Sequence, residues 1–329
     1  MEKKSLKTQA STEQALKRLV IGTRCSKLAL IQSNLVKKAL ESTFSGLVVE
    51  LKEIKTTGDF ITDIPLEKIG DKGIFIKELE AALLKKEIDL AVHSMKDMPT
   101  ILQPGLKIGA IMEREDPWDV FISAKEIAKL SDLAKGICIG SSSLRRRAQL
   151  LHHYPNLEIC SIRGNLDTRL KKMQRGECEG IILAYAGVKR MSWTSLISEV
   201  IPGEICLPAV GQGAIGIEIR SDDRELEVLI KALHCERTGL EVRAERAFLR
   251  RLEGGCQVPI GALARCNNNS LHLTGMVASI DGKLMFRGEK TGSIDEVEAL
   301  GNNLAEELLQ EGCGSILDQI RQECEFNDE

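Results

Sequence analysis

Aromatic residues are scarce in this chain: phenylalanine, tryptophan and tyrosine together make up 3% of its 329 residues. The core must therefore consist mainly of aliphatic side chains, which favours alternating strands and helices over an aromatic-rich all-β fold. No run of about 18 apolar residues occurs, so we expect no membrane-spanning helix. The N-terminal residues 1–18 are polar and lack the apolar segment of a secretory signal.

The sequence also lacks the usual metal-binding patterns. Its ten cysteines form no C-x-x-C pair, and His152 and His153 are adjacent, with no cysteine at ligand spacing. We therefore expect no metal. Many free cysteines without a signal peptide indicate a reducing compartment. We expect a cytoplasmic protein, or a protein of the plastid stroma if residues 1–17 are a trimmed targeting remnant.

An overall excess of positive charge is absent as well, since the formal net charge is −3. This excludes a nucleic-acid binder by charge alone. Between residues 145 and 175, however, eight basic residues face two acidic ones. They are Arg145, Arg146, Arg147, Arg163, Arg169, Lys171, Lys172 and Arg175, against Glu158 and Asp167. Such a local excess indicates a small anionic ligand.

The length predicts two or three domains. A strand at residues 19–22 is followed by a turn with Arg24 and by a helix that Ser26 caps. Residues 137–146 repeat this plan, with a strand, the serines 141–143 and then Arg145 and Arg146. A helix N-terminus after a strand attracts anions.

Further charged residues follow predicted strands. Lys96 and Asp97 follow the strand 88–92, Arg163 ends the strand 157–162, and Arg190 falls just inside a helix after the strand 180–184. In an open α/β sheet the carboxyl ends of the strands line the ligand crevice, so we expect these side chains to share one crevice. For a single arginine, a solvated charge is the simpler interpretation.

The rest of the chain predicts a segment that returns to the first lobe and a separate C-terminal domain. The turn 208–213 carries the chain back to the first lobe, and segment 113–117 is the outward crossing. The tail, with hairpin turns at 267–269 and 281–282, indicates a small antiparallel sheet covered by helices. The predicted fold is therefore two α/β lobes plus an α+β domain: lobe 1 at 18–113 and 213–233, lobe 2 at 117–208, and a C-terminal domain at 236–329. The long segment 56–73 is either a functional lid or disordered.

Cys256 follows Gly254 and Gly255 on an exposed loop after a helix. The negative end of that helix disfavours a thiolate, and no histidine lies near in sequence, so Cys256 is a poor nucleophile and a better attachment point. A buried, inert cysteine is the alternative. The arginines match a substrate with several carboxylates. Asp97 among them suits N–H binding or stabilisation of a forming cation, or else simply pairs with a basic neighbour.

Six stretches in order, over about residues 18–320, resemble the porphobilinogen deaminase (hydroxymethylbilane synthase) family. They are Gly22-Thr23-Arg24-Cys25-Ser26-Lys27-Leu28-Ala29, His93-Ser94-Met95-Lys96-Asp97-Met98-Pro99, Ser142-Ser143-Leu144-Arg145-Arg146, Arg163-Gly164-Asn165-Leu166-Asp167-Thr168-Arg169-Leu170, Pro208-Ala209-Val210-Gly211-Gln212-Gly213 and Gly254-Gly255-Cys256-Gln257. The resemblance implies two lobes of the periplasmic-binding-protein type and a third, α+β domain.

The resemblance also implies an activity: a transferase that joins four porphobilinogens head to tail, with loss of ammonia, into hydroxymethylbilane. It implies a dipyrromethane cofactor held by a thioether to Cys256, with Asp97 and Lys96 as catalytic residues. Cofactor contacts are implied for Arg24, Ser26, Lys96, Asp97, Ser142, Ser143, Arg145, Arg146, Arg163, Arg169 and Arg190, and substrate contacts for Arg24, Ser26, Arg163, Arg169, Arg190 and Gln212. Thr56, Gly58, Lys72 and Lys77 are implied as lid residues, which favours the lid over disorder.

Two other functions compete with this one. A two-lobed binding module for a small polycarboxylate explains the crevice but neither the third domain nor Cys256. A nucleic-acid site at residues 145–175 lacks interleaved aromatics. We expect a monomeric transferase with porphobilinogen as its small-molecule partner, and neither nucleic acid nor membrane as partners.

Overall fold

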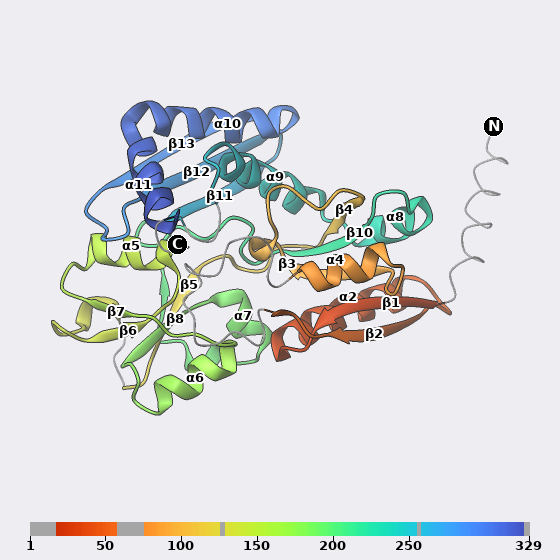
Figure 1. Ribbon diagram of the computed structural model, residues 1–329, viewed down its shortest axis with the longest axis horizontal. Coiled ribbons are helices and arrows are strands. Elements are labelled where there is room, and N and C mark those ends of the chain that lie inside the picture. Colours follow the sequence, from red (N-terminus) through yellow and green to blue (C-terminus); the bar gives the residue numbers. More distant parts are fainter. Residues whose placement is uncertain (1–17, 58–75, 126–128, 255–257, 326–329) are drawn as a thin grey trace.

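The computed structural model describes residues 18–57, 76–125, 129–254 and 258–325 (Figure 1). Three sheets, each with its own helices, make up this part of the chain. Two five-stranded sheets form the lobes, and a three-stranded sheet forms the C-terminal domain. Two α/β lobes plus a small α+β domain were predicted, and this fold class is confirmed.

Lobe 1 contains a sheet of order β2-β1-β3-β10-β4, in which β10 runs antiparallel to its neighbours β3 and β4. Its strands are β1 (Arg18–Arg24), β2 (Val48–Ile54), β3 (Leu90–Ser94), β4 (Leu106–Ile111) and β10 (Ile215–Arg220). Its helices are α2 (Lys27–Thr43), α4 (Lys77–Leu84) and α8 (Arg224–Ile230), with short 3-10 turns η2 (Met95–Asp97) and η5 (Lys231–Leu233).

Aliphatic side chains form the core of lobe 1, as the scarcity of aromatics predicts. Leu19 and Ile21 of β1 are fully buried with Val36 and Leu40 of α2, which lie on one helical face. A Cβ on Gly22 would lie 2.3 Å from Cδ1 of Ile88 and 3.0 Å from Cδ2 of Leu79 in α4. Close packing of α4 against the sheet therefore depends on this glycine.

Lobe 2 repeats the plan with the order β7-β6-β8-β5-β9. Its strands are β5 (Asp119–Ser123), β6 (Cys138–Gly140), β7 (Glu158–Cys160), β8 (Gly180–Ala184) and β9 (Glu199–Ile201). Its helices are α5 (Leu144–His153), α6 (Leu166–Gln174) and α7 (Tyr185–Arg190), with η3 (Leu130–Asp132) and η4 (Thr194–Leu196). The sequence reading did not find β5 and β9.

Two crossing segments, 112–118 and 202–214, join the lobes. The first leads from β4 into β5, the antiparallel strand of lobe 2, and the second leads back into β10, the antiparallel strand of lobe 1. These segments include the predicted crossings 113–117 and 208–213, and the predicted domain limits stay a prediction. The lobes also touch directly, since a Cβ on Gly187 of α7 would lie 3.7 Å from Leu28 of α2.

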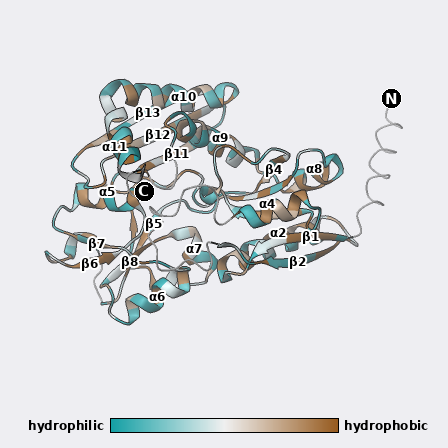
Figure 2. Cartoon of the chain, viewed as in Figure 1, coloured by the Kyte–Doolittle hydropathy of each residue, from teal (hydrophilic) through white to brown (hydrophobic). Residues whose placement is uncertain are grey.

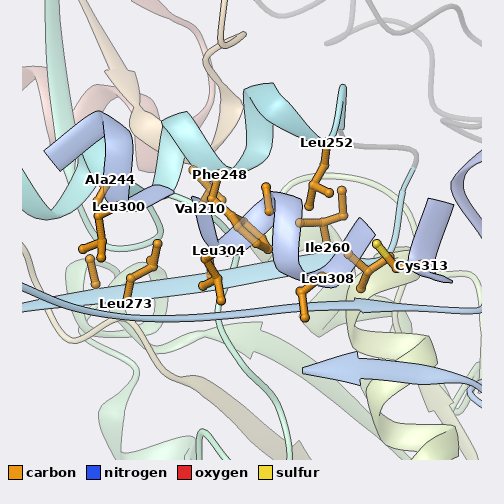
Figure 3. Packing of buried hydrophobic residues seen from close by; sticks show 14 of the residues in the cluster. Val210, Ala244, Phe248, Leu252, Ile260, Leu273, Leu300, Leu304, Leu308 and Cys313 are labelled. Atoms are coloured by element: carbon orange, nitrogen blue, oxygen red, sulfur yellow. The ribbon is translucent and has the colours of Figure 1, made fainter. Parts of the chain in front are cut away.

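The C-terminal domain packs helices on one face of an antiparallel sheet (Figures 1 and 2). Its strands are β11 (Ile260–Asn267), β12 (Ser270–Ala278) and β13 (Met285–Ser293); its helices are α9 (Glu236–Arg251), α10 (Val297–Leu308) and α11 (Gly314–Glu325), with η6 (Ile294–Glu296) and the π-helical turn η7 (Leu309–Cys313). Phe248 lies in its core with Val210, Leu300 and Leu304 (Figure 3).

This domain contacts both lobes. Glu245 of α9 accepts hydrogen bonds from the backbone of Gly211 at 2.7 Å and pairs with Arg114 at 2.5 Å, so it holds both crossing segments. At the far end, the carbonyl of Gly282 lies 2.8 Å from Nδ1 of His152 in α5. The carboxylate and the hairpin turn together fix the domain against the base of the crevice.

Cysteine pairing departs from the sequence reading in one place. Cys138 and Cys160, on neighbouring strands β6 and β7, form a disulfide bond, and their Cα atoms lie 6.0 Å apart. Parallel pairing of these strands brings the two residues together. Among the described residues, Cys178, Cys206, Cys235, Cys266 and Cys313 are not disulfide-bonded.

Candidate active site

The lobe 1 side of the site lies where β3 ends. Met95 is buried, and its backbone N–H donates to the carbonyl of Ala214 at 3.0 Å. With Met95 anchored inward, the turn η2 presents Lys96 half-buried and Asp97 exposed. Gln32 of α2 donates to the Ser94 hydroxyl at 2.9 Å and braces the same turn.

Arg24 ends the neighbouring parallel strand β1, so it lies at the same edge of the sheet as Asp97. The hydroxyl of Ser26 accepts a hydrogen bond from the N–H of Ala29 at 3.3 Å and caps α2 as predicted. Arg24 and Ser26 are both half-buried. Their positions fit the predicted crevice, and their contacts with a ligand stay a prediction.

The lobe 2 side begins at the serines after β6. Ser143 caps α5 by accepting from the N–H of Arg146. Ser142 donates to the carbonyl of Ile162 at 2.6 Å and lies 3.1 Å from the Ser161 hydroxyl. Both hydroxyls therefore already have protein partners, and Ser142 holds the loops after β6 and β7 together.

A buried carboxylate that the sequence reading missed holds both arginines of α5. Asp119, the first residue of β5, lies 2.7 Å from Nη2 of Arg145 through one oxygen and 2.7 Å from Nη2 of Arg146 through the other. Burial opposes its ionisation, but the two guanidinium groups outweigh that effect and hold the Asp119 pKa well below its usual range. The signal for β5 was the apolar run 120–122, which follows Pro117, Trp118 and Asp119.

Arg145 and Arg146 differ in whether a guanidinium N–H group is left for a ligand. Arg145 also donates to the carbonyl of Leu207 at 2.6 Å. Arg146 donates to the carbonyl of Ile182 at 2.9 Å, and its buried Nε has no hydrogen-bond partner among the described residues. A buried donor of this kind needs an acceptor, and a carboxylate would provide one.

Gln212 connects the lobes at the base of the crevice. Its amide nitrogen donates to the carbonyl of Pro117 at 2.6 Å and to Asp119 at 2.9 Å. Its amide oxygen lies 3.4 Å from Nζ of Lys96, which donates to it. The predicted role of Gln212 as a direct substrate contact stays untested, while these contacts make it a bridge between β5 and η2.

Three more arginines come from the other loops of lobe 2. Arg169 of α6 donates to the carbonyl of Gly164 at 2.8 Å. Arg190, the last residue of α7, donates to the carbonyl of Gly213 at 2.7 Å in the return crossing. Arg163 is half-buried and close enough to Arg169 to lower its pKa. The structure thus brings the predicted arginines of lobe 2 to the edge that faces Asp97.

Positive charge is in excess at this site. Burial, reinforced by repulsion from Arg146, lowers the pKa of Lys96 to about 8. Burial, with Arg146 and Arg163, lowers the pKa of Arg169 to about 10, and Asp97 opposes that shift. Buried cations whose pKa values fall need counter-anions, so these residues fit a ligand that carries several carboxylates.

Some predicted residues lie elsewhere. Cys256, Gly58 and Lys72 fall outside the described residues. Thr56 is buried after β2, and Lys77 is exposed at the start of α4. Among the residues that the structure describes, no group of histidine, cysteine and acidic side chains could hold a metal ion, and no helix is long and apolar enough to cross a membrane.

Two lobes with cationic side chains gathered at the ends of their strands are typical of a protein that binds an acidic small molecule. Comparison with known proteins makes this specific. Residues 19–228 match the family model described as porphobilinogen deaminase, dipyromethane cofactor binding domain, and residues 239–310 match the C-terminal domain of the same enzyme. The chain belongs to the porphobilinogen deaminase family.

Curated relatives agree over nearly the full length. The porphobilinogen deaminase of Carboxydothermus hydrogenoformans is 54% identical over 307 residues, which cover 93% of this chain and 98% of the relative. Those of Moorella thermoacetica and Chlorobium luteolum are 52% and 51% identical, covering 92% and 94% of this chain and 96% and 99% of theirs. The resemblance stated from the six motifs is therefore confirmed.

Solved structures with a similar fold are far more distant in sequence. A double mutant of the VFT2 domain of Bordetella pertussis BvgS is 13% identical with a TM-score of 0.44, covering 73% of this chain and 95% of that one. A putative methionine-binding lipoprotein of Bacillus subtilis is 15% identical with a TM-score of 0.42, covering 68% and 92%. Neither likeness bears on function.

Proposed function

We propose that the crevice around Asp97 is where this member of the porphobilinogen deaminase family builds its product. The family enzyme is a transferase that joins four porphobilinogens head to tail, with release of ammonia, into the linear tetrapyrrole hydroxymethylbilane. The observation that carries the assignment to this crevice is the excess of half-buried and buried cations beside one exposed carboxylate.

The cations bind and orient the substrate. Porphobilinogen carries an acetate and a propionate, so each ring added brings two carboxylates. Arg146, Arg163 and Arg169 from lobe 2 and Arg24 and Lys96 from lobe 1 are at hand to receive them, because a guanidinium fork matches a carboxylate.

Asp97 acts on the reacting ring. Its carboxylate accepts hydrogen bonds from pyrrole N–H groups and stabilises the cation that forms when ammonia leaves the aminomethyl carbon. The C–N electron pair leaves with the ammonia, and the carbon then bonds to the free α-carbon of the terminal pyrrole, which loses a proton. Because Lys96 adjoins Asp97, it holds a carboxylate of the same ring and keeps the ring aligned.

The dipyrromethane cofactor of the family supplies that first free pyrrole α-carbon when it is bound. The residues of the crevice fit such a polycarboxylate, since the buried Nε of Arg146 lacks an acceptor. Cys256 lies outside the described residues, shortly after the end of α9 in the sequence, and we propose it as the thioether anchor. Helix α9 ends at Arg251, as the argument for a tether rather than a nucleophile requires.

Intact mass spectrometry tests this function. The purified protein should show a mass increment equal to one dipyrromethane, and Cys256→Ser should remove it together with porphobilinogen consumption. Cys266→Ser is a matched control, because that partly exposed thiol lies in β11 of the same domain. An active protein with an unmodified Cys256 contradicts the assignment.

Several finer statements belong to the same proposal. We propose the domain limits 18–113 with 213–233, 117–208 and 236–329, and a monomeric and cytoplasmic enzyme that needs no metal. We also propose a lid in segment 56–73, which includes Thr56, Gly58 and Lys72, with Lys77 beside it. Sedimentation, cell fractionation and activity in the presence of a chelator test the first group. Limited proteolysis with and without porphobilinogen tests the lid.

A further inference from the structure

Asp119 accepts hydrogen bonds from more than one side chain. Both of its oxygens are used twice: one accepts from Arg146 at 2.7 Å and from the Gln212 amide at 2.9 Å. The other accepts from Arg145 at 2.7 Å and lies 3.4 Å from the thiol of Cys206. The Asp119 side chain is fully buried, yet it opens β5 at the edge of the sheet that borders the crevice.

The contact with Gln212 decides which way that amide points. Two acceptors, Asp119 and the carbonyl of Pro117, face its nitrogen, so its oxygen must turn to the other side. On that side lies Nζ of Lys96, which belongs to lobe 1. If the carboxylate were absent, the amide could turn over and present N–H groups to a cation.

Asp119 therefore acts on one side chain from each lobe. It holds the guanidinium of Arg146 in lobe 2 so that the unpartnered Nε is left available. Through Gln212 it places an acceptor on Lys96 in lobe 1. Gln212 and Arg114 also tie the two crossing segments together, because the Arg114 side chain donates to the Gln212 carbonyl at 2.8 Å.

We infer that Asp119 is a positioning residue for carboxylate binding. It orients Arg146 of lobe 2 directly, and it orients Lys96 of lobe 1 through the amide of Gln212. Arg145 is the inner partner of the same carboxylate and anchors it to the backbone at Leu207. This inference rests on the proposed function of the crevice and adds to it a residue that touches neither substrate nor cofactor.

The test uses the full-length holoenzyme and two substitutions. Asp119→Asn removes the charge, and Gln212→Met removes the amide link while leaving Asp119 with both arginines. We expect porphobilinogen consumption to fall by roughly 10²-fold in Asp119→Asn and roughly 10-fold in Gln212→Met, the scale of losing charge-assisted and neutral hydrogen bonds. Because Asp119 favours the charged form of Lys96, the alkaline limb of the rate in Asp119→Asn should move to lower pH by roughly 0.5–1 unit.

Glu199→Gln is the matched control, because Glu199 lies on β9 of the same sheet and accepts from the N–H of Leu130 at 2.8 Å, outside the site. It should keep the wild-type rate and pH profile. If Asp119→Asn does not fold, Gln212→Met still tests the link. An unchanged rate in Gln212→Met overturns the inference, and so does a folded Asp119→Asn with an unmoved alkaline limb.

The mass and turnover of the wild-type protein are measured in the same series. An inactive wild type without the cofactor mass contradicts the proposed function itself. An active wild type with unaffected variants contradicts only the role of Asp119.

Discussion

The two lobes share one sheet topology, and in each the antiparallel strand carries a fully buried carboxylate. In lobe 1, Glu218 of β10 lies 3.1 Å from Nε2 of His93 on β3. In lobe 2, Asp119 of β5 lies 2.7 Å from each of Arg145 and Arg146. The carboxylates differ in depth: Glu218 stands within its strand, opposite Ala91, while Asp119 is the first residue of β5.

Depth decides what each buried charge can do. Glu218 also raises the pKa of Glu80, after burial as the main cause, so its surroundings are acidic and closed. Asp119 reaches the crevice edge, where its partners face Lys96. The carboxylate on the equivalent strand thus belongs to the interior in lobe 1 and to the proposed binding site in lobe 2. Four sets of substitutions can break or sharpen this comparison.

The largest effect is expected at the exposed carboxylate of lobe 1. Asp97→Ala should lower turnover by roughly 10²–10³, because one key electrostatic stabiliser of the forming cation is lost. Single-turnover rates with porphobilinogen measure this, with Asp132→Ala as the control at an exposed acid of lobe 2. Near-normal turnover in Asp97→Ala would mean that the residue is structural.

Next in size is the difference between the two arginines of α5. Arg146→Lys should raise the KM for porphobilinogen by roughly 10–100-fold, since a charge-assisted hydrogen bond from Nε is lost. Arg145→Lys should instead lower the melting temperature, because Arg145 is bonded to Asp119 and to the Leu207 carbonyl. Equal effects of both substitutions on KM would refute this division of roles.

The interior pair of lobe 1 should affect stability alone. Glu218→Ala should lower the free energy of unfolding by about 2–4 kcal/mol, because it opens a cavity and leaves His93 without its partner. Turnover per folded molecule should stay at the wild-type level. Glu218→Gln retains an acceptor for His93 and should cost less. Urea unfolding read alongside activity separates the outcomes, and a loss of turnover in folded Glu218→Ala would place this pair in the catalytic machinery.

The smallest effect concerns the protonation of Lys96. Its pKa in the folded protein is about 8, below the ordinary 10.5. Between those values the unfolded chain holds a proton that the folded chain has lost, so stability contributed by this group rises with pH. For half-buried Lys96 the gain is less than about 1 kcal/mol after screening. Porphobilinogen affinity should move the other way and fall above pH 8, because binding needs the charged lysine.

Cys256→Ser protein without cofactor is the sample for this measurement, by urea unfolding and calorimetry from pH 7 to 10. Lys96→Met should remove both trends. If Lys96→Met keeps the loss of affinity above pH 8, another group is responsible.

Much of the site was predictable from short patterns. A strand, a hydroxyl-bearing turn and a helix recur at Ser26 and Ser143, and both serines cap their helices as expected. Parallel strands end at one edge, which brings Arg24 beside Asp97 and collects the arginines of lobe 2. These placements follow from sequence patterns that span only a few residues.

Asp119 and β5 were missed because their evidence is not local. The strand is five residues long and follows a proline, and its partners Arg145 and Gln212 lie 26 and 93 residues away. No sequence pattern within β5 indicates a partner so far away along the chain. The expected role of Arg145 as a direct ligand has a competing explanation in these contacts for the same reason.

By itself the sequence determined the lobes, the tail domain, the helix caps and the family, because these depend on periodicity, turn residues and ordered motifs. The tertiary structure alone decided which charges neutralise one another. Desolvation makes the pairing of buried charges depend on atoms brought together from distant segments, so only the folded chain shows that Asp119 holds Arg146 and orients the Gln212 amide toward Lys96.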